Sequence, residues 1–215
     1  LARSGMSVGV VSRNAEHLRP LVDELNKPSA LKVFAYGCDA TDEISVKKTF
    51  SRVVNDIGVP NLVVYSVQGF SPGRTIDVEV PAFEDSWRQN CLGGFLVGRE
   101  AARFLEPLGR GTIVFVGSSS AMIGRAGHLN LAVGKFGLRA IAQVMSRELW
   151  SSGIHVLHLV IDADIQESES PDTSIPQSDP AHIADLLHTL HSQPKSAWTS
   201  EIDVRPWNDS FWQHC

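Results

Sequence analysis

Three serines and a lysine in the middle of the chain are well suited to chemistry. Ser118, Ser119 and Ser120 stand together directly after an apolar run, and Lys135 follows farther along the chain. Serine hydroxyls donate and accept hydrogen bonds, and a lysine supplies a positive charge whose pKa responds strongly to burial. These groups could bind a polar substrate and assist the transfer of a proton.

A strand, a loop and a helix are predicted to position these groups. The β-branched, apolar run Thr112–Val116 predicts a buried strand. Small and polar residues over 117–127 predict a loop. A helix is expected from about Leu129 to Trp150, with Lys135 on its first turns. The hydroxyls therefore lie between a strand and the helix that carries the lysine.

Strands and helices alternate along the rest of the chain. The other expected strands are Ser7–Val11, Leu31–Tyr36, Leu62–Tyr65, Ile154–Ile161 and Glu201–Val204. The other expected helices are Ala15–Asn26, a helix capped by Thr41 and ending near Ile57, Phe83–Leu105 and Ala181–His191. Apolar strands separated by helices indicate a parallel sheet that is covered on both faces and binds ligands at its carboxyl edge. The prediction is an α/β, doubly wound, Rossmann-like fold in a single domain over residues 1–215.

Composition excludes several classes of protein. A net charge of −5 argues against a general nucleic-acid surface. The cysteines Cys38, Cys91 and Cys215 are widely spaced and form no CxxC pair, so we expect reduced thiols and no metal site. No apolar run approaches the roughly 20 residues of a membrane helix, and no signal-peptide pattern occurs at Leu1. A cytoplasmic protein without membrane or nucleic-acid partners is expected.

The segment GTIVFVGSSSAMIGRAGHLNLAVGKFGLRAIAQVMSR, residues 111–147, resembles the short-chain dehydrogenase/reductase family. Ser118 and Lys135 take the first and third places of the family's serine–tyrosine–lysine signature, and Leu131 stands in the place of the tyrosine. The resemblance implies that Ser118 binds the substrate carbonyl and that Lys135 binds the nicotinamide ribose. It also implies that Asn90 holds a water in a proton relay to the lysine. By this resemblance the chain is an atypical member of the family.

The replacement of the tyrosine removes the usual proton donor. Hydride delivery to a carbonyl must be matched by a proton, and general acid catalysis is worth roughly 10²–10⁴ in rate. The chain's two tyrosines, Tyr36 and Tyr65, lie on other predicted strands. His128, three residues before Leu131, is an alternative donor, although a loop histidine is more commonly just a solvent-exposed residue.

Several residues match cofactor-binding positions of the family. Arg13 follows the predicted strand Ser7–Val11 and, beside Ser12, suits the 2′-phosphate of NADP(H). Asp39 resembles the aspartate near the adenine ring, and Ser66 and Gly69 lie where the nicotinamide ribose is bound. Simple turn or surface roles remain open for Arg13 and Asp39.

The glycine-rich turn that holds a dinucleotide is absent from the start of the sequence. The residues LARSGMSVGVVSRN look like the end of the family's first helix and its second strand. We therefore expect the sheet to be missing its first strand, either because the chain is a fragment or because the protein lacks that strand. Asp162 stands where the family has Pro-Gly and is expected to place a negative charge near the nicotinamide.

The sequence also predicts roles for two segments near the carboxyl end and for the two longest helices. Residues 162–180 form a polar lid or a disordered insert, and residues 196–215 form an aromatic-rich tail packed over the sheet or across an interface. The helices over 83–105 and 129–150 are expected to join subunits of a homodimer or homotetramer.

Two functions are compatible with the sequence. One is a divergent NADP(H)-linked oxidoreductase acting on an unknown carbonyl or alcohol, with weak or unconventional catalysis. The other is a catalytically inactive relative, or a truncated product, that binds a nucleotide or a partner and serves a structural role. Fold alone does not separate these alternatives.

Overall fold

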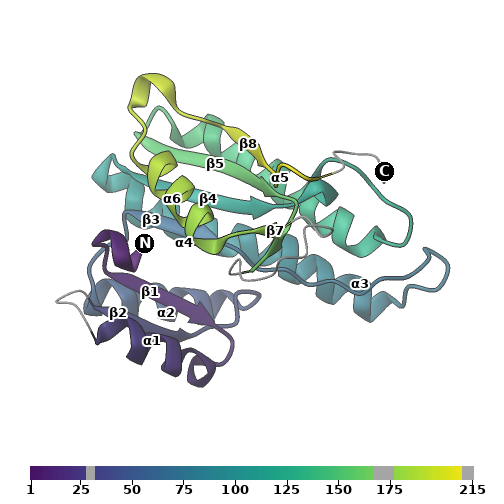
Figure 1. Cartoon of the computed structure of the whole chain (residues 1–215), viewed down its shortest axis with the longest axis horizontal. Helices are drawn as coiled ribbons and strands as arrows, with labels where there is room; N and C mark the ends of the chain where they lie inside the picture. The colour runs from purple at the N-terminus through teal and green to yellow at the C-terminus, as the bar shows by residue number, and fades with distance from the viewer. Residues whose placement is uncertain (28–31, 167–176, 210–215) are drawn as a thin grey trace.

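The computed structural model describes residues 1–27, 32–166 and 177–209. It shows a single α/β domain in which helices cover both faces of a four-stranded parallel sheet (Figure 1). The strands are β1 (Val8–Ser12), β2 (Val33–Gly37), β3 (Leu62–Tyr65), β4 (Gly111–Gly117), β5 (Ile154–Ile161), β6 (Asp164–Ile165), β7 (Gln177–Ser178) and β8 (Glu201–Val204). The helices are α1 (Arg19–Asn26), α2 (Glu43–Asp56), α3 (Val80–Trp87), α4 (Gly93–Leu105), α5 (Leu129–Leu149) and α6 (Pro180–His191).

The strands form separate parallel ladders instead of one continuous sheet. One sheet has the order β3-β4-β5-β8, and β1 pairs with β2 in a second sheet. Among the described residues, β1 and β3 share no ladder, and Figure 1 shows the β1–β2 pair apart from the four-stranded sheet. The predicted alternation and parallel pairing are confirmed, and in the described residues the single sheet is replaced by these two and the short pair β6–β7.

The core lies on both faces of the four-stranded sheet. On one face Ile113 and Phe115 of β4 pack with α2, α4 and α5, and on the other face Leu157 and Leu159 of β5 pack with α6. Every residue of β5 is buried, as expected for a central parallel strand. At Gly98 a Cβ would lie 2.6 Å from the Phe115 ring, so glycine lets α4 approach β4 closely.

Two predicted boundaries are corrected. The helix expected over Phe83–Leu105 begins at Val80 and is interrupted by a π-helical turn, Arg88–Leu92. The cap of α2 is Asp42, whose carboxylate accepts the backbone N–H groups of Ile44 and Ser45 at 2.7 and 3.0 Å. The Thr41 hydroxyl instead donates to Asp39 at 2.8 Å, and Thr41 precedes the N-cap position.

The polar segment 162–180 and the tail 196–215 are described in part. β6 and β7 pair in parallel at the two ends of the first segment, and residues 167–176 lie outside the described residues. In the tail, Trp198 stacks on His155 at 4.9 Å, whereas Trp207 is 91% exposed. Residues 210–215 also lie outside the described part. No helix in the described ranges is both long and apolar enough to cross a membrane.

Candidate functional site

The carboxyl ends of β3, β4 and β5 place Ser66, Ser118 and Asp162 along one edge of the sheet. Ser118 caps the short 3-10 turn Ser119–Ala121, and its hydroxyl accepts the N–H of Ser120 at 3.3 Å. This edge is where parallel α/β sheets bind ligands. The structure therefore puts Ser118 at the expected end of its strand.

Lys135 is buried between two strands. Its side chain is 2% exposed, and Nζ donates to the carbonyl oxygens of Val67 and Val116, each at 3.2 Å. Burial lowers the pKa of Lys135 to about 8, because the charged form is desolvated. The amine is thus held at the carboxyl ends of β3 and β4, in the immediate neighbourhood of Ser118.

Leu131 lies one helical turn before Lys135. Its side chain is 5% exposed and has no group that can donate a proton. His128 precedes α5 as its N-cap residue, and its ring stacks on Phe70 at 4.9 Å. The ring Nδ1 lies 3.1 Å from the Ala126 carbonyl, which a hydrogen on Nδ1 would satisfy. His128 is half-buried.

Asn90 occupies the π-helical turn and is fully buried. Its amide nitrogen donates to the carbonyl oxygens of Gly69 and Ser86 at 2.6 and 2.9 Å, and the Gly69 N–H lies 3.4 Å from its Oδ1. A Cβ at Gly134 would lie 2.5 Å from that of Asn90, so α5 passes very close to the turn. Asn90, Gly69 and the helix of Lys135 are therefore brought together.

Tyr65 supports the same turn from the end of β3. Its buried hydroxyl donates to the Gln89 carbonyl, next to Asn90. Gly93 leaves room for the Tyr65 side chain, because a Cβ at that position would collide with the hydroxyl. Burial raises the pKa of Tyr65, so its hydroxyl stays protonated as a structural donor.

A second group of predicted residues lies at the carboxyl ends of β1 and β2. Ser12 donates to the Asn14 carbonyl at 2.7 Å, and Arg13 is exposed. Hydrogen bonds from Thr41 lower the pKa of Asp39, and the charge of Arg13 contributes to that shift. Arg13 and Asp39 therefore lie near each other, and the charge of Asp39 also acts on Tyr65.

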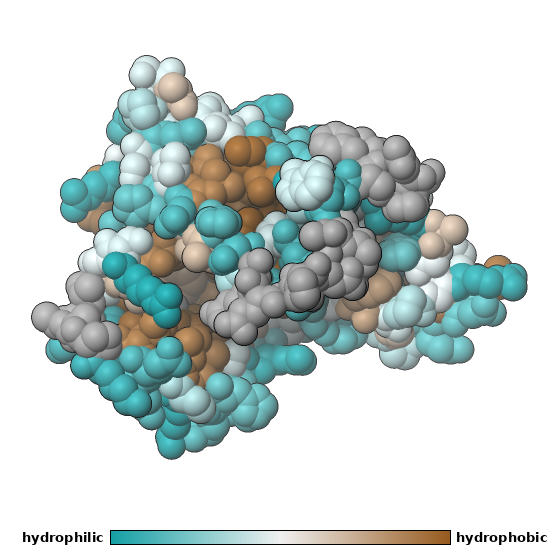
Figure 2. All heavy atoms as spheres, in the orientation of Figure 1, coloured by the Kyte–Doolittle hydropathy of each residue, from teal (hydrophilic) through white to brown (hydrophobic). Residues whose placement is uncertain are grey.

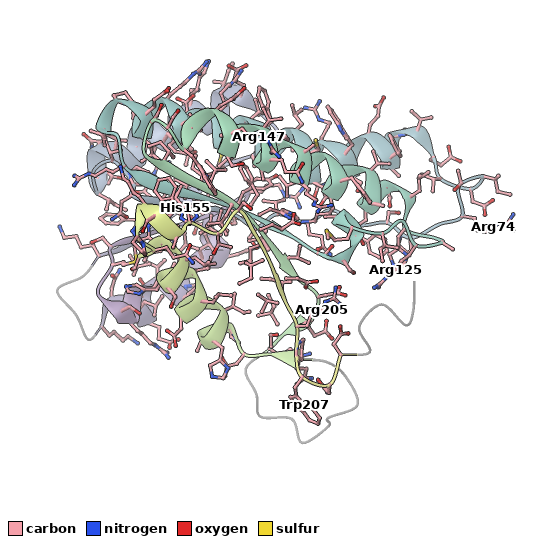
Figure 3. All side chains as sticks on the ribbon, turned by 90° about the horizontal axis from the view of Figure 1, so that it is seen from above. Arg74, Arg125, Arg147, His155, Arg205 and Trp207 are labelled. Atoms are coloured by element: carbon pink, nitrogen blue, oxygen red, sulfur yellow. The ribbon has the colours of Figure 1, made fainter. Side chains whose placement is uncertain are left out.

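Asp162 does not present an uncompensated charge. Its carboxylate accepts from the Ser119 hydroxyl at 2.7 Å and from Arg205 Nη1 at 2.9 Å, and Arg125 lies 3.6 Å away. Figure 3 shows Arg125 and Arg205 in the same region of the molecule, well apart from His155. The expected negative charge near the nicotinamide is thus neutralised. The sequence held no local signal for this, because the partners come from two segments that lie far from Asp162 along the chain, the loop over 117–127 and Arg205.

Sequence reasoning also missed a buried polar group on β5. His158 is 1% exposed and lies 3.0 Å from Glu201, which in turn binds Arg139. A histidine among apolar strand residues is a weak signal without its partners. Within the described ranges, no group of three or more histidine, cysteine or acidic side chains could hold a metal ion.

Comparisons with known proteins agree with this geometry. The family model described as short chain dehydrogenase matches residues 1–170. The 3-ketodihydrosphingosine reductase of Dictyostelium discoideum is 30% identical over 160 residues, which cover 66% of this chain and 48% of that protein. The chain spans about half the length of the first curated relatives that it matches.

Two solved structures have the same fold. A short-chain dehydrogenase from Rhodopseudomonas palustris is 33% identical with a TM-score of 0.84, covering 96% of this chain and 89% of that chain. An alcohol dehydrogenase from Thermococcus sibiricus, complexed with 5-hydroxy-NADP, is 18% identical with a TM-score of 0.86, covering 97% of this chain and 89% of that one. With a family match over most of its length, this chain belongs to the short-chain dehydrogenase family.

Proposed function

We propose that the protein is a divergent NADP(H)-linked oxidoreductase of an unknown carbonyl or alcohol substrate, with weak or unconventional catalysis. The observation that carries the proposal is the burial of Lys135, fixed to two backbone carbonyls beside Ser118. A desolvated lysine with a lowered pKa is typical of a functional position, because burying it without a purpose costs stability. Ser118 would bind the substrate oxygen in this role.

The residues at the two ends of the site fit an NADP(H) molecule in part. The exposed guanidinium of Arg13, next to Ser12 and Asp39, suits a phosphate on the adenosine ribose. Lys135 has donors for ribose hydroxyls, and Ser66 and Gly69 flank the same edge. When bound, the cofactor supplies the hydride. The structurally related Thermococcus sibiricus enzyme was solved with an NADP derivative, which is consistent with this choice.

We also propose that the sheet is missing one strand, together with its glycine-rich turn, between β1 and β3. Both strands run in parallel ladders, and no other described strand pairs with their facing edges. Val11 of β1 is 48% exposed, and Figure 2 shows hydrophobic side chains at the surface over β1 and, separately, over the four-stranded sheet. A strand in that space would cover apolar surface and satisfy two sets of backbone groups.

The alternative is a catalytically inactive relative that binds a nucleotide or a partner. Leu131 favours it, because a buried leucine stands where the family's acid is expected and cannot supply a proton. Asn90 is consistent with either function, since its hydrogen bonds hold the Gly69 loop whether or not a reaction occurs.

We further propose that the chain forms a homodimer or homotetramer through α4 and α5. Phe95 on α4 is 40% exposed, and Phe136 and Val144 on α5 are 43% and 53% exposed. Such apolar side chains on two adjacent helices would be covered by the same helices of a second copy.

Titration with NADPH tests the cofactor proposal directly. We expect quenching of tryptophan fluorescence and a rise in Tm with NADPH that Arg13→Ala weakens by about tenfold, by analogy with a lost charge-assisted hydrogen bond. Glu16→Ala is the surface control. No response at millimolar NADPH would reject the enzyme function for this chain.

Leu131→Tyr separates the two functions once binding is established. If the site is assembled, the new hydroxyl creates NADPH-dependent carbonyl reduction that Lys135→Met abolishes. A variant that binds NADPH but stays inactive with a panel of carbonyl compounds would favour the inactive relative.

A further inference from the structure

His158 lies on the same face of the sheet as the Ser118 and Lys135 pair. The ladder registers place it opposite Phe115 of β4 on one side and Glu201 of β8 on the other. Register partners in a parallel ladder point to one face, and Phe115 packs with α5, the helix that carries Lys135. The imidazole is 1% exposed and is therefore part of the floor below the candidate site.

Gly117 provides the space that His158 fills. A Cβ built on Gly117 would lie only 2.2 Å from His158 Nε2, so the ring packs directly against the backbone of residue 117. That residue connects Val116, whose carbonyl accepts from Lys135, to Ser118. The ring thus packs against the backbone between Ser118 and the Val116 carbonyl, which binds Lys135.

Glu201 and Arg139 fix the orientation of the ring. Nδ1 of His158 lies 3.0 Å from Glu201 Oε2, and Arg139 binds both oxygens of that carboxylate at 2.6 and 2.7 Å. A carboxylate only accepts hydrogen bonds, so Nδ1 carries the hydrogen and Nε2 is the bare nitrogen. Nε2 is buried without a hydrogen-bond partner in the described part of the chain.

The charged groups around His158 come from two elements. Glu201 of β8 favours the protonated ring, and Arg139 and Lys135 of α5 oppose it, while β4 contributes the uncharged Phe115 and Gly117. Burial is the largest influence and lowers the pKa of His158, which keeps the ring neutral. A neutral ring is compatible with the nearby amine.

We propose that His158 is a positioning residue, which holds the Gly117 backbone and thereby the Val116 carbonyl and Ser118 in place beside Lys135, and which keeps water away from that amine. Its importance for catalysis rests on the proposed function, whereas the packing can be tested without cofactor. Two properties of His158 matter for this role. Its ring fills the space beside Gly117, and its hydrogen bond to Glu201 fixes the position of Nε2 against that glycine.

The first test uses the pH dependence of stability. Lys135 has a pKa of about 8 in the folded protein and 10.5 as its ordinary value, so the unfolded chain binds more protons between these pH values. Stability from this group therefore rises with pH from about 8 towards 10.5. The difference in Tm between the parent and Lys135→Met, measured at pH 8 and pH 10, isolates the contribution of Lys135.

His158→Ala is expected to reduce the Lys135-dependent increase in Tm between pH 8 and pH 10 by at least half, because water then reaches the amine. His155→Ala is the matched control, since His155 is equally buried on the same strand but lies against α6. The His155→Ala variant should be less stable than the parent and should keep the Lys135-dependent increase in Tm. If His158→Ala does not fold, His158→Asn takes its place, because the amide can still donate to Glu201 while opening space; a smaller reduction is then expected. An unchanged rise in the folded variant would overturn the proposal.

A double-mutant cycle tests the contact with Gly117. Gly117→Ala presses a methyl group on the imidazole, whereas in Gly117→Ala/His158→Ala the methyl enters the vacated space. We expect the loss of Tm in the double variant to be smaller than the sum of the two single losses, and additive losses would contradict the contact.

NADPH titration of the same proteins distinguishes the oxidoreductase proposal from the positioning role of His158. If NADPH does not bind, the enzyme function is rejected, while the stability results alone decide the role of His158.

Discussion

At the scale of single residues, the buried hydrogen bonds of Asn90 are expected to contribute strongly to stability. Replacing Asn90 with alanine removes the side-chain hydrogen bonds to Gly69 and Ser86, so the Gly69 N–H loses its Asn90 partner, while the Ser86 hydroxyl still donates to the Gly69 carbonyl. We expect Asn90→Ala to lower the free energy of unfolding by about 2–4 kcal/mol, given that each unsatisfied buried group costs roughly 1–3 kcal/mol. Urea denaturation measures this loss. Asn55→Ala, at an exposed position, should change it by less than about 0.5 kcal/mol.

The functional residues that could be predicted are those with a fixed spacing along the chain. Ser118, Leu131 and Lys135 lie on one strand, loop and helix, so the resemblance could assign their places, and the structure puts Ser118 and Lys135 at the same edge. His158 and Asp162 could not be interpreted in that way. Their partners Glu201 and Arg205 are far away in sequence, and only the three-dimensional pairing of β5 with β8 brings them together.

At the scale of elements, Asp162 connects the ends of β4, β5 and β8. Arg205 is nearly buried and also binds Asp203 and Asp209, so losing one of its three carboxylates leaves part of its charge compensated. Asp162→Asn should therefore lower the free energy of unfolding, measured by urea denaturation, by about 2 kcal/mol. This is less than the roughly 3–5 kcal/mol typical of a fully broken buried ion pair. The cost should persist in 0.5 M NaCl, because salt screens buried pairs weakly. Asp77→Asn, which breaks an exposed pair with Arg74, is the control and should have almost no effect.

Element boundaries were less predictable than element types. Thr41 and Asp42 are both good N-cap residues, and the choice between them depends on Asp39, which takes the threonine hydroxyl. The break in the helix over 83–105 has no glycine or proline at Arg88–Leu92 to signal it. The π-helical turn there coincides with the buried hydrogen bonds of Asn90 and Tyr65, which are tertiary contacts.

For the whole molecule, buried histidines predict sensitivity to acid. Burial lowers the pKa of His155 and of His191, which join β5, β4 and α6 through bonds to Thr199 and Thr112. Their folded pKa values lie below the ordinary 6.5, so the unfolded chain binds more protons and stability falls as pH drops below about 6.5. We expect the urea midpoint to decrease from pH 7 to pH 5. His155→Phe, which can still stack on Trp198, should reduce this decrease; an equal decrease would contradict the role of His155.

The overall alternation of strands and helices was predictable, because apolar periodicity is a local property. The sequence predicted a single sheet without its first strand, and the separation of β1–β2 from the other sheet could not be predicted, because strand pairing depends on contacts across the whole fold. The helices over 83–105 and 129–150 were predicted to join subunits, and in the structure α4 and α5 carry exposed apolar side chains. We propose that these side chains join copies of the chain, and the mass of the protein in solution tests that proposal.

Phe136 provides the test of that assembly. Phe136→Glu places a charge in the proposed interface, where it would be buried without a partner, so we expect dissociation to a monomer with a loss in apparent affinity of at least about tenfold. Light scattering coupled to size-exclusion chromatography measures the mass over a range of concentrations. Phe70→Glu is the matched control, because Phe70 is also 43% exposed but lies in the loop against His128. A parent protein that is already monomeric, or a mass unchanged by Phe136→Glu, would reject α4 and α5 as the interface. Dissociation by both variants would mean that the loop of Phe70 also contributes.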